Sequence, residues 1–300
     1  MILTKRIDLL CMLGDYLLSN NPAWVETRDK ASKENAWFIP EFIDLATGNI
    51  AELFLQKDIL EKWVAEYSLP SANLHPKQVG IVMAGNIPLV GFHDFLCAFI
   101  TGHQSVIKPS TKDGILIRHL IEKMNEWNNE VKDVTRFSEG MLKNCHAYIA
   151  TGSNNSAGYF EYYFKKYPHI IRRNRTSVAI LTGKESREEL EKLADDVYLY
   201  FGRGCRNVTK IYVPVNYDFI PLLKVFEKYN HFADYHKYKN NYDYNLAIHI
   251  LNKKIYMSNA SLLLVEESSP FSPISQLNYE FYTHEDELAA SLKNNSAIQC

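Results

Sequence analysis

Residues 78–88 have the sequence Gln-Val-Gly-Ile-Val-Met-Ala-Gly-Asn-Ile-Pro. The first seven form a short apolar run with β-branched members, which is typical of a buried strand. Gly85-Asn86-Ile87-Pro88 then predicts a turn, and the apolar run Leu89–Ile100 predicts a helix that Gly102 closes. This stretch therefore predicts a strand–turn–helix unit, with the helix N-terminus at the carboxyl end of the strand.

The same order of elements is repeated along the chain. Residues 1–75 look helical, with breaks at Asn21-Pro22 and Ile39-Pro40. Strands that alternate with helices of ordinary length indicate βαβ units, so we expect an α/β fold with mainly parallel sheets, covered on both faces. Further strands are predicted at Ser105–Lys108, Ala147–Ala150, His169–Arg173, Ser177–Leu181, Thr209–Val215, Ser261–Glu267 and Asn278–Thr283. Further helices are predicted at Gly114–Trp127, from Asn155 onward, and at Arg187–Tyr200, Phe219–Tyr229 and Glu285–Lys293.

A second stretch, Phe201-Gly-Arg-Gly-Cys-Arg-Asn207, places one thiol in a glycine-flanked turn between a helix and a strand. A capping box at Ser186–Glu189 is predicted to begin the helix that leads into it. The thiolate is the reactive form of cysteine, and nearby cations such as Arg203 and Arg206 favour it. Cys205 is therefore a candidate nucleophile. The alternative is a small buried cysteine beside a solvated turn.

The composition limits the classes of function. The chain has 300 residues, of which 46% are hydrophobic, and a formal net charge of −2, so it has an ordinary globular profile. This charge gives no support for nucleic acid or an anionic membrane surface as the main partner. The five cysteines form no Cys-x-x-Cys pair, so neither a disulfide framework nor a zinc site is implied and a cytoplasmic location is expected. Asp8 and Asp15 interrupt the apolar N-terminus, which we interpret as an amphipathic helix, and no uncharged run approaches a membrane span.

Five short motifs, in this order along the chain, are similar to motifs of the aldehyde dehydrogenase superfamily. Gly85–Leu89 resembles its Trp-Asn-Phe-Pro-Leu turn, and Val106–Ser110 resembles its Val-Leu-Lys-Pro-Ser strand end. Thr151-Gly152-Ser153 resembles its Phe-Thr-Gly-Ser turn. Gly204-Cys205 stands where its Gly-Gln-x-Cys nucleophile does, and Glu266-Glu267 resembles its Glu-Glu-x-Phe-Gly-Pro stretch. Within the superfamily, the chain more closely resembles the long-chain acyl-CoA reductase family of bacterial luciferase operons.

The resemblance implies an aldehyde-dehydrogenase-like fold of two three-layer α/β/α units. Residues 1–175 would hold the N-terminal helices and a Rossmann-like cofactor domain, although the usual Gly-x-Gly-x-x-Gly fingerprint is absent. Residues 176–300 would hold the catalytic cysteine. Relatives continue past the position of Cys300 with further strands and a dimerisation flap, which implies a truncated chain, a fragment or a different mode of association. A homo-oligomer, or a complex with an acyl-transferring or acyl-activating enzyme, is the expected assembly.

The resemblance also implies roles for individual residues. Cys205 would attack a carbonyl, while the Asn86 amide and the Cys205 backbone N–H would stabilise the oxyanion. Lys108 would hold the adenosine ribose or a 2′-phosphate, Ser153 would meet the pyrophosphate, and Glu267 would bond the nicotinamide ribose. The alternatives are an Asn86 that bonds its own turn, an exposed Lys108 and a solvated Glu267. The implied cofactor residues are Met83, Ala84, Gly85, Lys108, Ser110, Thr111, Thr151, Gly152, Ser153 and Glu267.

One departure from the superfamily changes the expected reaction. Members that oxidise aldehydes use a glutamate in a Glu-Leu-Gly-Gly-Lys stretch to activate water. The corresponding residues 171–177 are Ile-Arg-Arg-Asn-Arg-Thr-Ser, and there is no carboxylate from Tyr162 to Lys184. Without such a base, water competes poorly for an acyl-cysteine. The chemistry of a thioester reductase is therefore expected.

Cofactor choice depends on position 111. NAD-specific relatives often have a glutamate three residues after the strand-end lysine, where it bonds the ribose hydroxyls and repels a 2′-phosphate. Thr111 stands at that position, so charge favours NADPH. Arg172 and Arg206 are candidates for contacts with phosphates of CoA or cofactor. For the other arginines of residues 171–177, a surface-exposed basic strand is an equal alternative.

These observations lead to one hypothesis and two alternatives. The protein is expected to be an NADPH-dependent oxidoreductase that takes an acyl group from acyl-CoA or an acyl-protein onto Cys205 and reduces the thioester to an aldehyde. The first alternative is a CoA-acylating dehydrogenase of short aldehydes that uses NAD. The second is a catalytically idle subunit that carries acyl groups or serves as a scaffold. The Tyr-rich segment 229–256 is interpreted as helix and loop packing, in preference to an acyl-tail pocket or a subunit contact.

Overall fold

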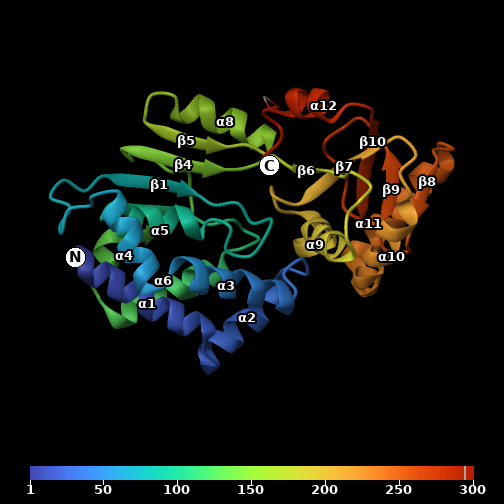
Figure 1. The fold of residues 1–300 in the computed structure, drawn as a ribbon. Coiled ribbons are helices and arrows are strands. Elements are labelled where there is room, and N and C mark those ends of the chain that lie inside the picture. Colours follow the sequence, from blue (N-terminus) through green and yellow to red (C-terminus); the bar gives the residue numbers. More distant parts are fainter. Residues whose placement is uncertain (294) are drawn as a thin grey trace. The chain divides into compact units, whose positions relative to one another are not determined.

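The computed structural model describes residues 1–293 and 295–300. The chain divides into two compact units, Met1–Arg173 and Asn174–Cys300 (Figure 1). Each unit contains a five-stranded sheet with helices, so the mixed α/β class expected from the alternation of elements is confirmed. The cofactor-binding and catalytic roles of the two units, with the expected boundary after residue 175, stay predictions.

The sheet of the N-terminal unit is entirely parallel. Its strands, in chain order, are β1 (Gln78–Val82), β2 (Gln104–Lys108), β3 (Thr135–Phe137), β4 (Ala147–Thr151) and β5 (His169–Arg172). In space the order is β3-β2-β1-β4-β5, so the chain order reverses at β1, where open α/β sheets bind ligands beyond the carboxyl ends of the strands. Val82 pairs with Lys108 and with Ala150, so the carboxyl ends of β1, β2 and β4 lie side by side.

Helices cover both faces of this sheet. They are α1 (Leu3–Leu18), α2 (Pro22–Glu34), α3 (Pro40–Phe54), α4 (Lys57–Glu66), α5 (Phe92–Ile100), α6 (Ile115–Trp127), α7 (Val131–Val134) and α8 (Asn154–Phe164). The breaks expected at Asn21-Pro22 and Ile39-Pro40 are confirmed, because each proline begins a helix, where its missing N–H costs little. Alternating strand residues enter two apolar clusters: Ile107 belongs to the cluster with α1–α7, and Val106 to the cluster with Phe164 of α8.

The sheet of the C-terminal unit is parallel except for one edge strand. Its strands are β6 (Ser177–Ile180), β7 (Val208–Pro214), β8 (Tyr256–Ser258), β9 (Leu263–Glu266) and β10 (Gln276–Tyr282), in the spatial order β6-β7-β10-β9-β8. Only the pair of β8 and β9 is antiparallel among these described strands. The mainly parallel arrangement expected from the sequence is therefore confirmed.

The helical elements of this unit are α9 (Arg187–Tyr198), η1 (Leu199–Gly202), α10 (Phe219–Phe226), η2 (Glu227–Asp234), α11 (His236–Leu251) and α12 (Glu285–Leu292). The predicted capping box begins α9: the Ser186 Oγ accepts the N–H of Glu189 at 3.3 Å, and the Glu189 carboxylate accepts the N–H of Ser186 at 2.8 Å. None of the helices in the described part of the chain is long and apolar enough to cross a bilayer.

The sequence predicted no bounds for four elements: α7, which has only four residues, α11, β3 and β8. The α11 helix buries Tyr238, Tyr242, Asn245 and His249, which lie three or four residues apart on one face. Because that face consists of Tyr, Asn and His, the aliphatic pattern of an amphipathic helix is missing from the sequence. The strands β3 and β8 have three residues each, which is too short for an alternating pattern.

Candidate active site

Two turns at the carboxyl edge of the N-terminal sheet pack directly against each other. The N–H of Met83, after β1, donates to the carbonyl of Lys108 at the end of β2, with an N···O distance of 3.0 Å. A Cβ added to Gly85 would lie 2.7 Å from the Cβ of Ser110, closer than real side chains approach. Glycine is therefore required for the close packing of the Ser110 side chain on this turn.

The third turn at this edge, residues 151–153, begins α8. Ser153 is the N-cap residue, and its Oγ accepts the N–H of Ser156 at 3.3 Å. An added Cβ at Gly152 would lie 3.0 Å from the side chains of both Ser156 and Phe160, so this turn packs closely on the helix it begins. We call residues 83–85, 108–111 and 151–153 the cofactor edge. Three adjacent parallel strands bring these expected cofactor residues together.

The turn that contains Asn86 is held by a buried acid. Leu89 has a left-handed backbone (φ 54°), which delays the start of α5 to Phe92, three residues later than predicted. The Leu89 N–H donates to Asp113 Oδ2 at 2.7 Å, and burial raises the pKa of Asp113 to about 8. Asn86 itself is half-buried. Sequence reasoning missed Asp113, and an acid among the polar residues after β2 is the signal that would have indicated it.

Arg172, at the end of β5, already has a counter-charge. Its Nη1 lies 2.6 and 2.8 Å from the two carboxylate oxygens of Asp94. Asp94 is buried in the first turn of α5, where the helix dipole also favours a negative charge. This pair ties β5 to α5 within the N-terminal unit. A contact between Arg172 and a phosphate stays a prediction.

Cys205 lies on a four-residue turn between η1 and β7. The N–H of Asn207 donates to the carbonyl of Gly204 at 3.1 Å, which places Cys205 at the second position of a closed turn. The side chains of Cys205 and Arg206 are both exposed. The Cys205 carbonyl accepts a hydrogen bond from Ser177 Oγ at 3.4 Å. The turn therefore presents the thiol to solvent while its backbone is tied to β6, which corrects the alternative of a buried cysteine.

The buried side chain of Asn207 fixes this turn to the preceding helix. Its Oδ1 accepts the N–H of Gly204 at 2.7 Å, and its Nδ2 donates to the carbonyls of Asp196 and Leu199 at 2.8 and 2.9 Å. Those two carbonyls lie at the C-terminal end of α9, where helix carbonyls lack partners within the helix. The sequence alone predicts no role for Asn207. The pattern that would have indicated a role in fixing the turn is an amide residue just after a glycine-rich turn that follows a helix.

The backbone before this turn is left-handed over three residues. Tyr200, Phe201 and Gly202 have φ values of 55°, 56° and 69°. This conformation costs roughly 1–2 kcal/mol for each residue that has a side chain. The buried ring of Phe201 packs against Phe232 and Tyr238, with centroid distances of 4.8 and 5.3 Å. Aromatic packing therefore stabilises a strained segment next to the candidate nucleophile.

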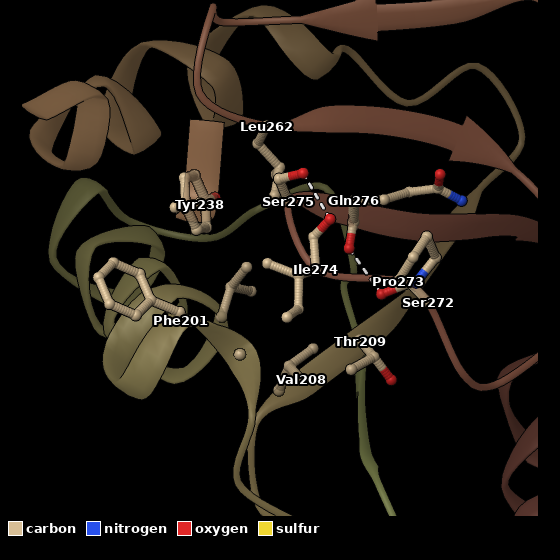
Figure 2. A pocket seen from close by; sticks show the side chains of 12 residues that line it. Phe201, Val208, Thr209, Tyr238, Leu262, Ser272, Pro273, Ile274, Ser275 and Gln276 are labelled. Atoms are coloured by element: carbon tan, nitrogen blue, oxygen red, sulfur yellow. Dashed lines mark hydrogen bonds between the residues drawn. The ribbon is translucent and has the colours of Figure 1, made fainter. Parts of the chain in front are cut away.

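Figure 2 shows a small cavity under η1. Phe201 and Tyr238 lie on one side of it, and Ile274 and Gln276 lie on the other. Its volume is about 20 Å³, which admits no more than one water molecule. It has no room for an acyl chain. The Tyr-rich segment forms η2, α11 and β8 and packs on Phe201, in agreement with the expected helix and loop packing.

Two expected cofactor residues differ in their charge environment. Glu267, after β9, forms an ion pair with Lys254 at 2.6 Å, and this hydrogen bond lowers the pKa of Glu267. Lys108, at the end of β2, is half-buried, and no described residue bonds its ammonium group. Lys108 thus offers an available positive charge at the cofactor edge, whereas Glu267 is already paired. Within residues 1–293 and 295–300, no group of three or more His, Cys, Asp or Glu is placed to hold a metal ion.

Solved aldehyde dehydrogenases have a similar fold. An aldehyde dehydrogenase from Bacillus cereus, solved as its NAD+ complex, matches with a TM-score of 0.69 and 12% identity, covering 99% of this chain and 70% of that one. The aldehyde dehydrogenase KauB from Pseudomonas aeruginosa matches with a TM-score of 0.68 and 12% identity, covering 98% and 70%. An oxidoreductase from Marinobacter aquaeolei matches with a TM-score of 0.70 and 13% identity, covering 96% and 70%. The aldehyde-dehydrogenase-like fold is therefore confirmed.

The sequence matches the family model described as acyl-CoA reductase (LuxC) over residues 44–219, which is more than half of the chain. The chain belongs to this acyl-CoA reductase family, as its motifs indicated. Among curated proteins, no sequence matches the chain. Family and fold together support an oxidoreductase that acts on aldehyde or acyl groups.

Proposed function

We propose that the protein is an NADPH-dependent acyl-thioester reductase, with acyl-CoA or an acyl-protein as the acyl donor. The observation that carries this proposal is the exposed Cys205 thiol, presented on a turn that Asn207 fixes to its own unit. A nucleophile needs this combination of access and fixed orientation. Membership of the acyl-CoA reductase family supports an acyl thioester as the substrate.

In the proposed first step, the Cys205 thiolate attacks the acyl carbonyl, a C–S bond forms, and the CoA thiolate leaves. The Asn86 amide and the Cys205 N–H donate hydrogen bonds to the acyl oxygen as negative charge develops on it. No carboxylate occurs between Tyr162 and Lys184 to deprotonate a water, so hydrolysis of the acyl-cysteine is slow. Addition of a hydride to the acyl carbon would then break the C–S bond, release the aldehyde and restore the Cys205 thiolate.

The residues of the cofactor edge fit a nicotinamide dinucleotide. The Gly85 turn ends β1 beside the ends of β2 and β4, where open α/β sheets bind ligands, and the N-terminus of α8 at Ser153 suits a pyrophosphate. Lys108 provides a positive charge, and Thr111 is exposed and uncharged, which favours a 2′-phosphate. When bound, NADPH supplies the hydride that reduces the acyl carbon. Comparing the rate of aldehyde formation with NADPH and with NADH shows which of the two cofactors the protein prefers.

The decisive experiment is transfer of label from acyl-CoA to the protein. Wild-type protein incubated with [14C]acyl-CoA is expected to bind one acyl group, which peptide mapping locates at Cys205. Cys205→Ala is expected to abolish the label. Cys300→Ala removes the other exposed cysteine of the described residues and is expected to keep it. Label that persists in Cys205→Ala would contradict the proposal.

A panel of acyl chain lengths and both cofactors separates the related functions. Preference for long acyl groups and NADPH supports the proposal. Preference for short groups and NADH indicates a CoA-acylating aldehyde dehydrogenase. Stoichiometric label on Cys205 without any aldehyde, in the presence of either cofactor, indicates an acyl-carrying subunit.

A further inference from the structure

One buried cation of the N-terminal unit lies outside the cofactor edge and has no counter-charge. Arg6, on α1, is only 3% exposed, and burial lowers the pKa of its guanidinium. Among the residues that the structure describes, none accepts a hydrogen bond from its Nε or Nη1, and no carboxylate pairs with it. A buried charge without a partner is strongly destabilising. The position of Arg6 therefore indicates a partner outside the chain.

The guanidinium borders a cavity of about 90 Å³, which has room for about three water molecules. The walls come from α1, the loop before β1, the turn between α5 and β2, and the end of α7 before β3. Most of these segments lead directly into parallel strands, so the cavity lies at the amino end of the sheet, opposite the cofactor edge. Gly102, in the turn, has a φ of 75°, and an added Cβ there would collide with Arg6 Nη1. The turn is thus shaped around the guanidinium.

His103 lines the same cavity and has a defined tautomer. Its Nδ1 accepts the N–H of Lys77 at 3.1 Å and lies 3.4 Å from the Asn73 amide nitrogen. Burial and the charges of Arg6 and Lys77 lower the pKa of the ring, which favours its neutral form. A neutral imidazole that accepts at Nδ1 carries its proton at Nε2. His103 therefore supplies a neutral donor beside the Arg6 cation.

The charges around the cavity are mainly positive. The Met1 ammonium and Lys5 share one acid, Glu130, at 3.1 and 3.0 Å. Lys77, next to the cavity, is exposed and adds a further positive charge. Glu130, together with Asp133 next to the cavity residue Val134, does not balance these cations and Arg6. The local field therefore favours an anion in the cavity.

We propose that this cavity binds a small oxyanion, with Arg6 as its counter-charge and His103 as a second donor. Guanidinium donors match the oxygen geometry of phosphate and carboxylate groups, which makes these anions the best fit. The volume admits one such group in place of about three waters, and it excludes a nucleotide. Because the anion binds only the folded chain, its concentration is linked to the stability of the N-terminal unit.

The test measures thermal stability and binding for the full chain. Sodium phosphate and sodium acetate are titrated against sodium chloride at equal ionic strength. We expect a saturable rise in Tm and one calorimetric site with at least one oxyanion, and a smaller, non-saturating change with chloride. The oxyanion with the lower Kd identifies phosphate or carboxylate as the natural group. Equal effects of all three salts, or no saturable effect at all, would overturn the proposal.

A variant of Arg6 and a control variant of a lysine remote from the cavity locate the binding site. Arg6→Met removes the charge with little change in side-chain length, and we expect it to weaken oxyanion binding at least tenfold. Without added anion it is expected to be at least as stable as wild type, because an uncompensated buried charge is removed. Lys30→Met changes an exposed residue of α2 that does not line the cavity, and it is expected to keep the binding. Unchanged oxyanion affinity in Arg6→Met would refute the proposal.

Two further variants keep the test decisive. His103→Gln is expected to weaken binding about tenfold, and it gives the answer if Arg6→Met does not fold. Lys108→Met separates this site from phosphate bound at the cofactor edge. Binding that is lost in Lys108→Met but kept in Arg6→Met would assign the anion to the cofactor edge and overturn the proposal. None of these measurements depends on reductase activity, so they stand apart from the proposed function.

Discussion

The cofactor edge and the Cys205 turn are both places where strands meet helices, but they are held in different ways. At the cofactor edge, three parallel strands end side by side, and the turns are fixed by backbone contacts such as Met83 to Lys108. The Cys205 turn follows three left-handed residues, and one side chain, Asn207, makes most of its fixing hydrogen bonds. The first arrangement distributes its stability over many contacts, and the second depends on a single residue. Substitutions should therefore affect the two regions unequally.

The largest effect is expected for Asn207→Ala. This change leaves two helix-end carbonyls and one N–H without their partner, so we expect unfolding to become easier by about 3 kcal/mol. We also expect acylation at Cys205 to slow much more than cofactor binding weakens. Chemical denaturation and the rate of acyl transfer check these outcomes. Arg206→Ala, an exposed residue of the same turn, is the control for stability. Equal stability and equal rates of acyl transfer in Asn207→Ala and Arg206→Ala would contradict the special role of Asn207.

The second prediction concerns Asp113, a titrating group that supports the Asn86 turn. The pKa of Asp113 is about 8 in the folded chain and near 3.8 when unfolded, so the folded state holds its proton more tightly. The stability that it contributes is fully present at low pH and is lost as pH rises to about 8, by up to about 1.4 kcal/mol per pH unit. Asp113→Asn is expected to abolish this slope between pH 6 and 8, measured by urea unfolding at each pH.

Asp133→Asn is the matched control, because Asp133 is exposed on α7. It is expected to keep the slope of the wild type. A slope that survives in Asp113→Asn would show that another group supplies the pH dependence. Asp113 would then give the Asn86 turn no support that depends on pH.

A smaller effect is expected for Gly85→Ala at the cofactor edge. The new methyl group would overlap Ser110, which costs about 2 kcal/mol when a packed site must shift. Because the change lies where the cofactor is proposed to approach the backbone, NADPH affinity should fall while labelling of Cys205 by acyl-CoA continues. At Gly140 an added Cβ meets no atom within 4 Å, so Gly140→Ala is expected to change neither NADPH affinity nor the labelling of Cys205. Equal loss of labelling in Gly85→Ala would argue against separate tasks for the two regions.

The smallest effect is expected for Ser153→Ala. Loss of the N-cap hydroxyl of α8 costs about 1 kcal/mol, and the helix N-terminus should bind the cofactor less tightly. Ser153→Thr retains a capping hydroxyl, so it is expected to keep most of the stability and most of the cofactor affinity of the wild type. Thermal unfolding and cofactor titration measure the two quantities. A Ser153→Ala variant with normal cofactor affinity would restrict this residue to a structural role.

Sequence and structure agree best where the signal is local. The run at Gln78–Val82 and the prolines at 22 and 40 predicted a strand and two helix starts, because chain geometry at these residues depends on near neighbours. The sequence indicated helix and loop packing in the segment of α11 but not the bounds of this helix, whose buried face consists of Tyr, Asn and His. Its burial depends on partners such as the Ile274 carbonyl, 2.9 Å from the Asn245 amide, and no local pattern reveals those partners.

The candidate site shows the same division. The sequence placed Cys205 in a turn after a helix, most of the cofactor residues at the ends of three strands, and Glu267 at the end of a fourth. Which turns are neighbours follows from the strand order, and that order depends on long-range pairing. The roles of Asp113 and Asn207 also appear only in three dimensions, since each acts through a hydrogen bond to a turn that it supports. A polar residue in a loop has many possible partners, and the sequence does not select among them.

The sequence by itself determined the α/β class, the family and the candidate nucleophile, because these rest on periodicity, turn residues and motif order. The tertiary structure alone decided that Asp113 is buried under the Asn86 turn, that Asn207 fixes Cys205, and that Arg6 lies uncompensated beside a cavity. The physical reason is that burial and charge compensation are properties of the whole surroundings of a side chain. Those surroundings are assembled from segments far apart in the chain.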